Sequence, residues 1–322
     1  MGNVSIEEQT LDISVQSLHH AWQNFSRGKS RSKDFLVFWY SLEDKLTSLH
    51  LDLKSENYRH GGYRSFMVTD RKRRHIQVAS IRDRVVHRLL YEYLVNIFDH
   101  TFFYNVWSCR KGKGLLGAIE RTQEFFRDHY DQYVWKADIK KFFDHVDHTF
   151  LKRMLARKVR DPIAIYVLHN IIDSYCVSGN RGGGIPIGNV TSQIFANIYL
   201  HELDRFVIHQ LKPRAYLRYG DDFFLIAETR DLAEQYRGQA KKFLEEDLHL
   251  FINQRQDRIR KVRWGFHFLG TEIFSKGRRL DQRNRTRIMQ RVSPDTIASY
   301  SGLLRAHEKP DKLKEVYWKL LS

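Results

Sequence analysis

The spacing of apolar and polar residues changes along the chain, and these changes predict its elements. Before Gly61 and Gly62 the apolar positions recur mostly at helical spacing. Residues 63 to 80 then alternate loosely between apolar and basic side chains, which predicts a twisted hairpin with a cationic tip at residues 71 to 74. Helical spacing returns over residues 81 to 98.

The middle of the chain predicts short strands between helices. Residues 133 to 139 form an apolar run that includes Asp138, which predicts a strand. Residues 215 to 219 and 223 to 227 are apolar runs separated by Gly-Asp-Asp, which predicts a tight hairpin with two carboxylates at its bend. Two more strands are expected over 251 to 255 and 265 to 274. Helices are expected over 115 to 129, 147 to 159, a stretch ending near 175, 191 to 210, 231 to 248, and the basic tail from 275, with a glycine-rich break at 179 to 184.

Composition narrows the class of partner. The chain of 322 residues has 54 Lys and Arg against 38 Asp and Glu, a net charge of +16, and such an excess favours binding a polyanion by counterion release. Nucleic acid is the leading partner. An anionic membrane is the rival, but no apolar run approaches the ~18 residues of a spanning helix, and the polar N-terminus has no signal-peptide pattern. We therefore expect a soluble, cytoplasmic protein of two or three subdomains with no membrane partner.

Three aspartates are candidates for metal chemistry. Nucleotidyl transfer needs two cations held by oxygen ligands, and Asp138 would join Asp221 and Asp222 if their strands are neighbours in one sheet. Two alternatives stay open at this point. An Asp pair in a turn is commonly solvated, and an Asp after a strand is commonly a helix cap.

Four motifs stand in an order that resembles the motif set of reverse transcriptases. The resemblance covers residues 60 to 275 and is weaker in the tail. Its motifs are Asp-Ile-Lys-Lys-Phe-Phe at 138 to 143, Gly-Ile-Pro-Ile-Gly-Asn-Val-Thr-Ser-Gln at 184 to 193, Tyr-Gly-Asp-Asp at 219 to 222, and Phe-Leu-Gly at 268 to 270.

The resemblance implies a fold, a domain order and a metal site. It implies an α+β right-hand polymerase with fingers, an antiparallel-sheet palm and a short helical thumb. The N-terminal helices and fingers would span 1–130, the palm 131–274 with an interleaved fingers segment at about 150–185, and the basic thumb 275–322. The metal site would comprise Asp138, Ile139, Asp221 and Asp222, holding two Mg²⁺ ions, and whether Mn²⁺ replaces Mg²⁺ stays open.

The resemblance also assigns residues to the incoming nucleotide. Arg74 falls where the finger arginine contacts the triphosphate, and Phe143 falls where a ring stacks under the sugar. A bulky ring there would exclude a 2′ hydroxyl, so the substrate would be a deoxynucleotide. Gly188 would allow close backbone approach, and Ile187 replaces an amide found in many relatives, which predicts reduced fidelity. The alternatives are a solvated Arg74, a core position for Phe142 or Phe143, and a core position for Ile187.

Other positions are predicted to hold the template and primer. Arg110 and Lys113 resemble the family's second motif, and Leu269 and Gly270 resemble the turn that presents the primer end. Arginines recurring every four residues in the tail would share one helical face. The full predicted set is Arg110, Lys113, Gln193, Tyr219, Leu269, Gly270, Arg283, Arg287 and Arg291. A solvated loop lysine, a plain strand turn and a charged helix face without a partner are the alternatives.

The expected function is RNA-directed DNA polymerisation on an element-encoded RNA template. The Ile-Gly-x-x-x-Ser-Gln form of one motif is similar to reverse transcriptases of diversity-generating retroelements, which are error-prone. Two alternatives are a defence-associated reverse transcriptase using a noncoding RNA, and a noncatalytic RNA-binding or splicing factor. Expected partners are an RNA template, a DNA or RNA primer, dNTPs, a structured noncoding RNA and a small accessory protein. In one departure from the family, residues 253 to 257 lack the lysine that often follows the palm helix.

Overall fold

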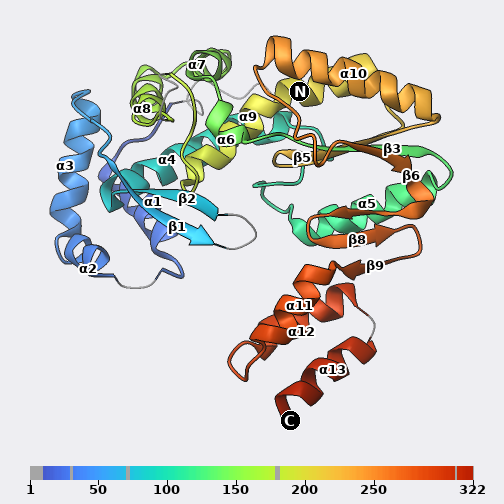
Figure 1. The fold of residues 1–322 in the computed structure, drawn as a ribbon. Helices are drawn as coiled ribbons and strands as arrows, with labels where there is room; N and C mark the ends of the chain where they lie inside the picture. The colour runs from blue at the N-terminus through green and yellow to red at the C-terminus, as the bar shows by residue number, and fades with distance from the viewer. Residues whose placement is uncertain (1–9, 30–31, 70–72, 178–181, 309, 322) are drawn as a thin grey trace. The chain divides into compact units, whose positions relative to one another are not determined.

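The computed structural model describes residues 10–321, except residues 30–31, 70–72, 178–181 and 309. Helices alternate with antiparallel strands along the chain (Figure 1), which confirms the predicted α+β class. The chain forms two compact units, each built from three separate stretches. Unit 1 comprises Met1–Phe102, Lys140–Asp204 and Leu244–Leu250, and unit 2 comprises Phe103–Ile139, Arg205–Phe243 and Phe251–Ser322.

Unit 1 is mainly helical, with one two-stranded hairpin. Side chains of Ser14, Ser32, Ser80, Asp147 and Asp161 accept backbone N–H bonds at helix starts, which fixes where these helices begin. Its elements are α1 (Val15–Ser26), α2 (Lys33–Tyr40), α3 (Leu42–Lys54), β1 (Tyr63–Thr69), β2 (Arg73–Ala79), α4 (Ile81–Phe98), the 3₁₀ turn η2 (Asp99–Thr101), α6 (Phe142–His145), α7 (His148–Ala156), α8 (Pro162–Asp173) and α9 (Val190–Phe206).

The hairpin of unit 1 is where the sequence predicts it. β1 and β2 pair antiparallel from Tyr63 opposite Ala79 to Thr69 opposite Arg73. Of the predicted cationic tip at residues 71 to 74, residues 71 and 72 lie outside the described residues, and residues 73 and 74 begin β2. Phe66, Met67 and Val68 of β1 expose their side chains, so one part of this hairpin offers an apolar surface.

Unit 2 contains two antiparallel sheets. The four-stranded sheet has the order β4-β5-β3-β6, and the three-stranded sheet has the order β7-β8-β9. Its elements are α5 (Leu115–Asp128), β3 (Tyr133–Asp138), the π-turn η3 (Val207–Leu211), β4 (Ala215–Tyr219), β5 (Asp222–Ala227), α10 (Arg230–Asp247), β6 (Arg258–Lys261), the 3₁₀ turn η4 (Val262–Trp264), β7 (Phe266–Phe268), β8 (Thr271–Phe274), β9 (Gly277–Leu280), α11 (Gln282–Arg291), α12 (Ile297–His307) and α13 (Pro310–Leu321).

The four-stranded sheet is buried on both faces in its centre. Val134, Phe224 and Ile226 belong to one core cluster that also includes Phe125 and Phe126 of α5. Trp135 and Phe223 alternate with these residues and pack edge to face, with ring centroids 5.4 Å apart. Burial on both sides explains why β3 and β5 are nearly continuous apolar runs in the sequence.

A buried acid ties helix α10 to this sheet. Asp257 accepts hydrogen bonds from Trp135 Nε1 at 2.8 Å and Arg237 Nη2 at 2.8 Å, and lies 2.5 Å from Lys241 Nζ. Burial alone would raise the pKa of Asp257, but the bonds from Arg237, Lys241 and Trp135 outweigh it and lower the pKa. The charged carboxylate is therefore the stable form.

Three predicted elements near the C-terminus are wrong. Residues 251 to 255 do not form a strand: Ile252 makes one isolated bridge to Ile139, and a turn follows because Gln256 N–H bonds the Asn253 carbonyl at 2.8 Å. The strand there is β6, which is basic and carries no apolar alternation that would reveal it. Residues 265 to 274 form the hairpin β7–β8 rather than one strand, and β9 precedes the helices of the tail.

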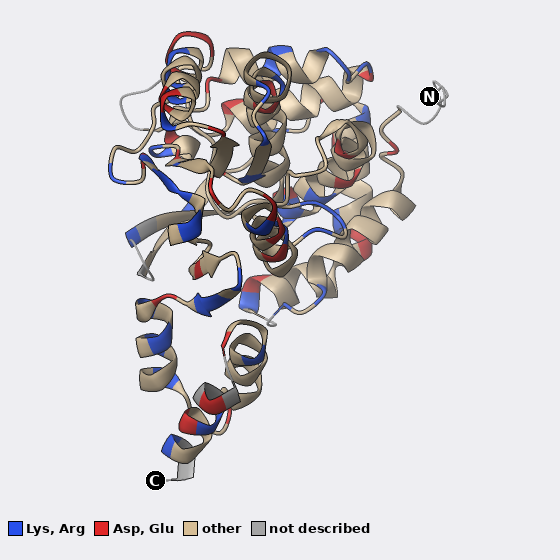
Figure 2. Cartoon of the chain, turned by 90° about the vertical axis from the view of Figure 1, so that its right-hand side faces the viewer, with Lys and Arg blue, Asp and Glu red and all other residues tan. Residues whose placement is uncertain are grey.

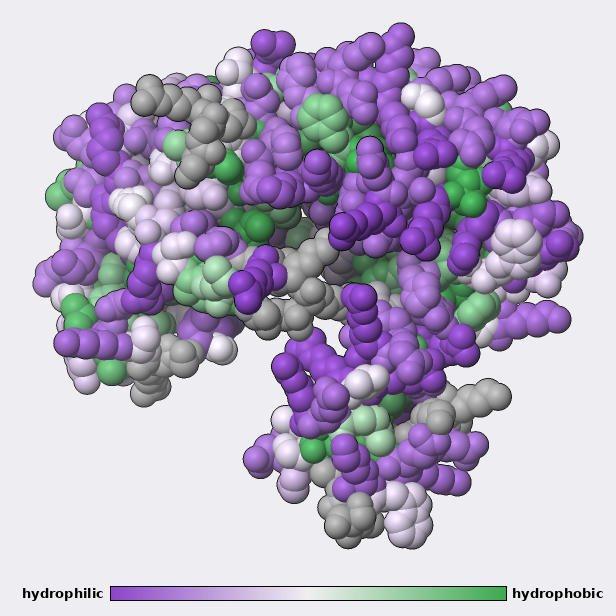
Figure 3. Space-filling view, in the orientation of Figure 1, coloured by the Kyte–Doolittle hydropathy of each residue, from purple (hydrophilic) through white to green (hydrophobic). Residues whose placement is uncertain are grey.

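The C-terminal helices enclose a small core of their own. Leu280, Ile288, Leu304 and Val316 are buried together, with partly buried side chains around them. The view in Figure 3 shows these helices covered mainly by hydrophilic residues. Within the described part of the chain, no helix combines the length and the apolar content that crossing a membrane would require.

Candidate active site

The carboxylate-bearing bend is the turn between β4 and β5. Tyr219 pairs with Asp222, so Gly220 and Asp221 form a two-residue turn, and Gly220 adopts a positive φ of 65° that suits glycine. β5 also pairs with β3, which sets Asp138 directly opposite Asp222. The Ile139 N–H donates to the Asp221 carbonyl at 3.1 Å. The fold therefore brings the three predicted aspartates together at one end of the sheet.

Hydrogen-bond donors contact two of these carboxylates. Asn253 Nδ2 donates to Asp138 Oδ2 at 2.9 Å, and Lys136 Nζ lies 3.1 Å from Asp222 Oδ1. Lys136 also contacts Gln256 Oε1 at 3.2 Å. Like charges directly opposite in a sheet repel each other, so these donors stabilise the pair.

The donor set fits a hard divalent cation, because Mg²⁺ prefers carboxylate and carbonyl oxygens. Among the described residues, no group of three His, Cys, Asp or Glu side chains is arranged to hold a metal ion as the structure stands. One oxygen of Asp138 and one of Asp222 face an amide and an ammonium group instead. The metal site of Asp138, Ile139, Asp221 and Asp222 therefore stays a prediction whose backbone geometry is in place.

A buried arginine supports the bend from inside the sheet. Arg218 of β4 is fully buried, and its Nη1 donates to the Gly220 carbonyl at 3.1 Å. Its backbone bonds the neighbouring loop, with Arg218 N–H donating to Asn105 and Trp107 N–H donating to the Arg218 carbonyl, both at 3.0 Å. The loop at residues 105 to 107 thus extends the sheet beside the bend.

The two basic residues predicted to hold the template contact their own loop. Arg110 Nη1 donates to the carbonyls of Phe103 at 2.8 Å and Val106 at 3.2 Å. Lys113 Nζ donates to the Tyr104 carbonyl at 2.6 Å and lies over the Tyr104 ring, 3.4 Å from its centroid. Both residues thus stabilise the loop, and contact with the template stays a prediction.

Tyr219, Leu269 and Gly270 also lie in unit 2. Tyr219 and Leu269 are partly buried and pack against the core cluster of the sheet. Burial, and then the nearby Cys109, raise the pKa of Tyr219. Leu269 and Gly270 form the β7–β8 turn with φ values of 53° and 79°. The predicted turn is therefore present, and its contact with a primer is untested.

The segment containing Ile187 and Gly188 lies against β2 in unit 1. Gln77 N–H donates to the Ile187 carbonyl at 2.9 Å, and Asn189 Nδ2 donates to the Gln77 carbonyl at 3.0 Å. Gly188 has φ +116°, and a Cβ there would lie 2.7 Å from Ile76 Cγ2. Glycine is thus required for packing on β2. Ile187 is half-buried, so its side chain is neither a core residue nor fully exposed.

The remaining nucleotide residues are also in unit 1. Phe142 is 1% exposed and Phe143 is half-buried, so Phe142 is the core residue of the two. Gln193 is exposed although its neighbours at the start of α9 are buried, which leaves its amide accessible. Arg74 pairs with Val68 in the hairpin, and its side chain lies outside the described residues.

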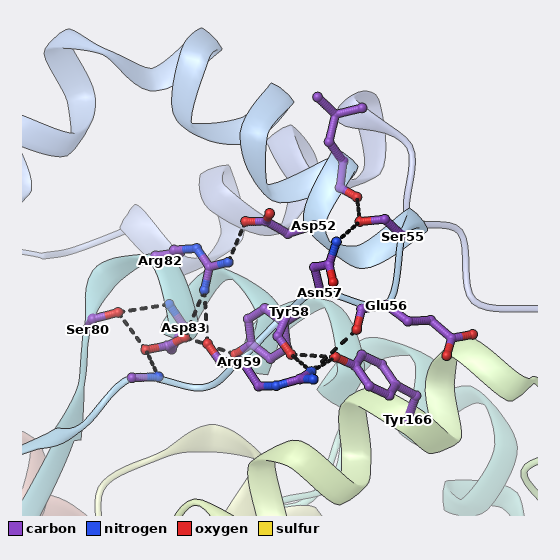
Figure 4. A network of polar contacts seen from close by, with 12 residues as sticks. Asp52, Ser55, Glu56, Asn57, Tyr58, Arg59, Ser80, Arg82, Asp83 and Tyr166 are labelled. Atoms are coloured by element: carbon purple, nitrogen blue, oxygen red, sulfur yellow. Dashed lines mark hydrogen bonds and ion pairs between the residues drawn. The ribbon is translucent and has the colours of Figure 1, made fainter.

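A polar network holds the loop before β1 to the start of α4 (Figure 4). The buried Asp83 accepts hydrogen bonds from Tyr58 Oη at 2.9 Å, Ser80 Oγ at 2.6 Å and Gly61 N–H at 3.1 Å. Arg82 bonds Asp52 Oδ2 at 2.8 Å. Arg82 is therefore part of this network.

The basic stripe of the tail lies on a helix, as predicted. α11 contains Arg283, Arg287 and Arg291, of which the first and last are exposed. Figure 2 shows Lys and Arg segments recurring on the helices toward the C-terminus. The helical spacing is confirmed, and contact with a duplex stays a prediction.

The fold with its carboxylate-bearing hairpin defines a template-copying polymerase class. Solved structures of apo telomerase from Candida tropicalis and of telomerase from Candida albicans with a telomeric RNA fragment share the fold, with TM-scores of 0.55 and 0.53 and identities of 14% and 11%. They match 82% and 86% of this chain and 57% and 58% of their own. The chain belongs to the reverse transcriptase (RNA-dependent DNA polymerase) family, whose model matches residues 64–273.

Two relatives are similar in sequence to parts of this chain. Protein YkfC of Escherichia coli K12 is 26% identical over 273 residues, 72% of each chain. The group II intron-encoded protein LtrA of Lactococcus lactis is 24% identical over 179 residues, which is 53% of this chain but 29% of LtrA. The chain thus spans less than a third of LtrA and under three fifths of the telomerase chains.

These comparisons confirm the enzyme class and the polymerase fold predicted from the motifs. Enzymes of the family generally use divalent metal ions. The comparisons do not separate a diversity-generating role from other reverse transcriptase roles. Sequence reasoning missed Lys136 and Arg218; the one available signal was that Lys136 stands two residues before Asp138 and so shares its face of the strand.

Proposed function

We propose that this chain is an RNA-directed DNA polymerase that copies an RNA template into cDNA by two-metal nucleotidyl transfer. The observation that carries the proposal is the pairing of Asp138 with Asp222 across β3 and β5 in a chain of the reverse transcriptase family. A bond from Ile139 N–H to Asp221 fixes the third aspartate beside this pair.

The reaction joins a primer to a nucleotide. The primer 3′ oxygen forms a bond to the α-phosphorus of a dNTP, the bond to the β-phosphate oxygen breaks, pyrophosphate leaves, and the 3′ proton passes to solvent. Bound Mg²⁺ ions would activate the attacking oxygen and stabilise the leaving one. Asp138, Asp221 and Asp222 would hold these ions, with the Ile139 carbonyl as a further oxygen ligand.

Roles for the other residues follow the family resemblance. Arg74 would bind the triphosphate, Phe143 would stack under the sugar, and Ile187 with Gly188 would contact the nascent pair. The exposed Gln193 supports a contact with substrate, because its amide is accessible at the start of α9. Template and primer would lie along the residues predicted for them, among which Arg283 and Arg291 are exposed.

For the biological role we propose error-prone copying of an element-encoded, structured RNA, as in diversity-generating retroelements. Support comes from Ile187, which cannot offer the amide hydrogen bonds that a glutamine would. A small accessory protein would add RNA affinity. A second candidate is an intron-type or defence-type enzyme acting on a noncoding RNA, and the similarity to LtrA, named as a group II intron-encoded protein, favours the intron type.

Primer extension tests the activity. Wild type should extend a DNA or RNA primer on an RNA template with dNTPs and Mg²⁺, and Asp221→Ala should lose at least about a thousandfold in rate. Asp231→Ala, which alters an exposed aspartate at the start of α10, is the matched control and should keep wild-type activity. Equal synthesis by wild type and Asp221→Ala would refute the mechanism.

Error counting tests the biological role. Sequencing of cDNA made by wild type and by Ile187→Gln should show fewer substitutions in the variant. An unchanged error spectrum would remove the link between Ile187 and low fidelity. Sequencing RNA that copurifies with the wild-type protein would then separate a repeat-derived template from an intron RNA.

A further inference from the structure

Lys136 contacts one of the candidate metal-binding carboxylates, that of Asp222, although no motif assigns it a role. It stands on β3 two residues before Asp138, so both side chains project from the same face of the strand. Its Nζ lies 3.1 Å from Asp222 Oδ1 and 3.2 Å from Gln256 Oε1. The lysine side chain is only 13% exposed and the Asp222 side chain 31% exposed, so solvent screens the ion pair incompletely.

This position matters because two carboxylates oppose each other across the strands. Asp138 and Asp222 are register partners, and like charges in such a pair destabilise the sheet. Asp138 accepts a hydrogen bond from a neutral amide, that of Asn253. Lys136 brings a full positive charge to Asp222, which offsets the repulsion in the metal-free protein.

We propose that Lys136 is a resident counter-ion that occupies Asp222 Oδ1 without metal and is displaced from this oxygen when a divalent cation binds. The inference rests on the proposed function, because it takes Asp222 as a metal ligand. A lysine ammonium and a divalent cation are both attracted to the same carboxylate, so the two compete. The lysine thus keeps the carboxylates ordered before metal arrives and weakens the affinity for free cation.

A resident counter-ion affects the Mg²⁺ affinity in a direction that a purely structural ion pair would not. In Lys136→Met, the protein should unfold at a lower temperature without metal, because the positive charge that offsets the repulsion between Asp138 and Asp222 is removed. Mg²⁺ should then stabilise the variant at roughly three- to tenfold lower concentration than wild type, since its competitor is gone. Lys136→Arg, which keeps the charge, should behave like wild type.

Metal titration of the full chain tests this without any polymerase assay. Thermal unfolding is followed over a range of MgCl₂ concentrations, and Mn²⁺ binding is measured by electron paramagnetic resonance. Lys276→Met, at an exposed lysine in the β8–β9 turn of the same unit, is the matched control and should match wild type. Lys136→Gln, which keeps a hydrogen-bond donor but no charge, replaces the methionine variant if that variant does not fold.

Each result decides one question. An unchanged or higher Mg²⁺ requirement in both uncharged variants overturns the counter-ion role. A lower requirement in the uncharged variants, with Lys136→Arg unchanged, supports it. Failure of the proposed function is seen separately: wild type would not extend primers, or Asp222→Asn would respond to Mg²⁺ like wild type.

Discussion

Acidification should destabilise unit 1 through a buried histidine chain. His87 is 1% exposed, and its Nδ1 lies 2.5 Å from Thr191 Oγ1 while its Nε2 lies 2.9 Å from His60 Nε2. The Gly61 carbonyl can only accept, so His60 Nδ1 carries the proton toward it at 2.5 Å. Neutral His60 then accepts from His87 Nε2–H, and Thr191 donates to His87 Nδ1. In this arrangement both rings are neutral, and burial disfavours adding a proton to His87.

The size of the effect follows from the pKa of His87. Burial, then the neighbouring His60 and Arg84, lower this pKa from 6.5 to about 3. The unfolded chain therefore takes up the proton first as the pH falls. Stability is fully present above pH 6.5 and is lost below it, by up to about 1.4 kcal/mol per pH unit. Between pH 7 and pH 5 the His87 contribution to the free energy of unfolding should fall by about 2 kcal/mol.

Urea unfolding at pH 7 and pH 5, followed by circular dichroism, measures this loss. His87→Gln removes the titrating group but keeps a donor for His60. Between pH 7 and pH 5, the free energy of unfolding of this variant should therefore fall by about 2 kcal/mol less than that of wild type. His19→Gln, at an exposed histidine of α1, is the control and should keep the wild-type dependence. Equal pH dependence in His87→Gln and wild type would show that the buried ring does not govern acid stability.

Three further changes test other parts of the structure. Asp257→Asn should cost about 2 kcal/mol in urea unfolding, because two cationic partners lose their buried counter-charge, and a loss below about 0.5 kcal/mol would contradict this. Gly188→Ala should destabilise by about 1–3 kcal/mol through its clash with β2, whereas Gly182→Ala, also at positive φ but with open space around it, should cost less; equal losses would exclude the clash. Under the proposed function, Phe143→Val should raise incorporation of ribonucleotides relative to deoxynucleotides by about tenfold or more in primer extension, and an unchanged ratio would remove Phe143 as the sugar-selecting ring.

The sequence predicted well those elements whose apolar pattern and pairing agree. The Gly-Asp-Asp hairpin and the neighbouring strand β3 were predictable because these strands are buried on both faces, and such strands appear in the sequence as nearly continuous apolar runs. β6 was not, because Arg258–Lys261 carries basic side chains and is held at the sheet by backbone pairing with β3. The β7–β8 turn was indicated only by the resemblance of its Phe-Leu-Gly motif, because the spacing over 265 to 274 predicts one strand and Leu269 adopts a positive φ that its residue type does not favour.

The functions of individual cations could not be predicted from net charge. An excess of +16 indicates a polyanionic partner but does not say which arginines face it. Arg218 is fully buried and donates to the Gly220 carbonyl, and Arg110 donates to two loop carbonyls, so both serve the bend and the loop beside it. A buried guanidinium is costly unless its donors are satisfied, so such contacts identify structural roles. Surface arginines such as Arg283 and Arg291 are therefore better candidates for phosphate contacts than the loop cations that the motif pattern favoured.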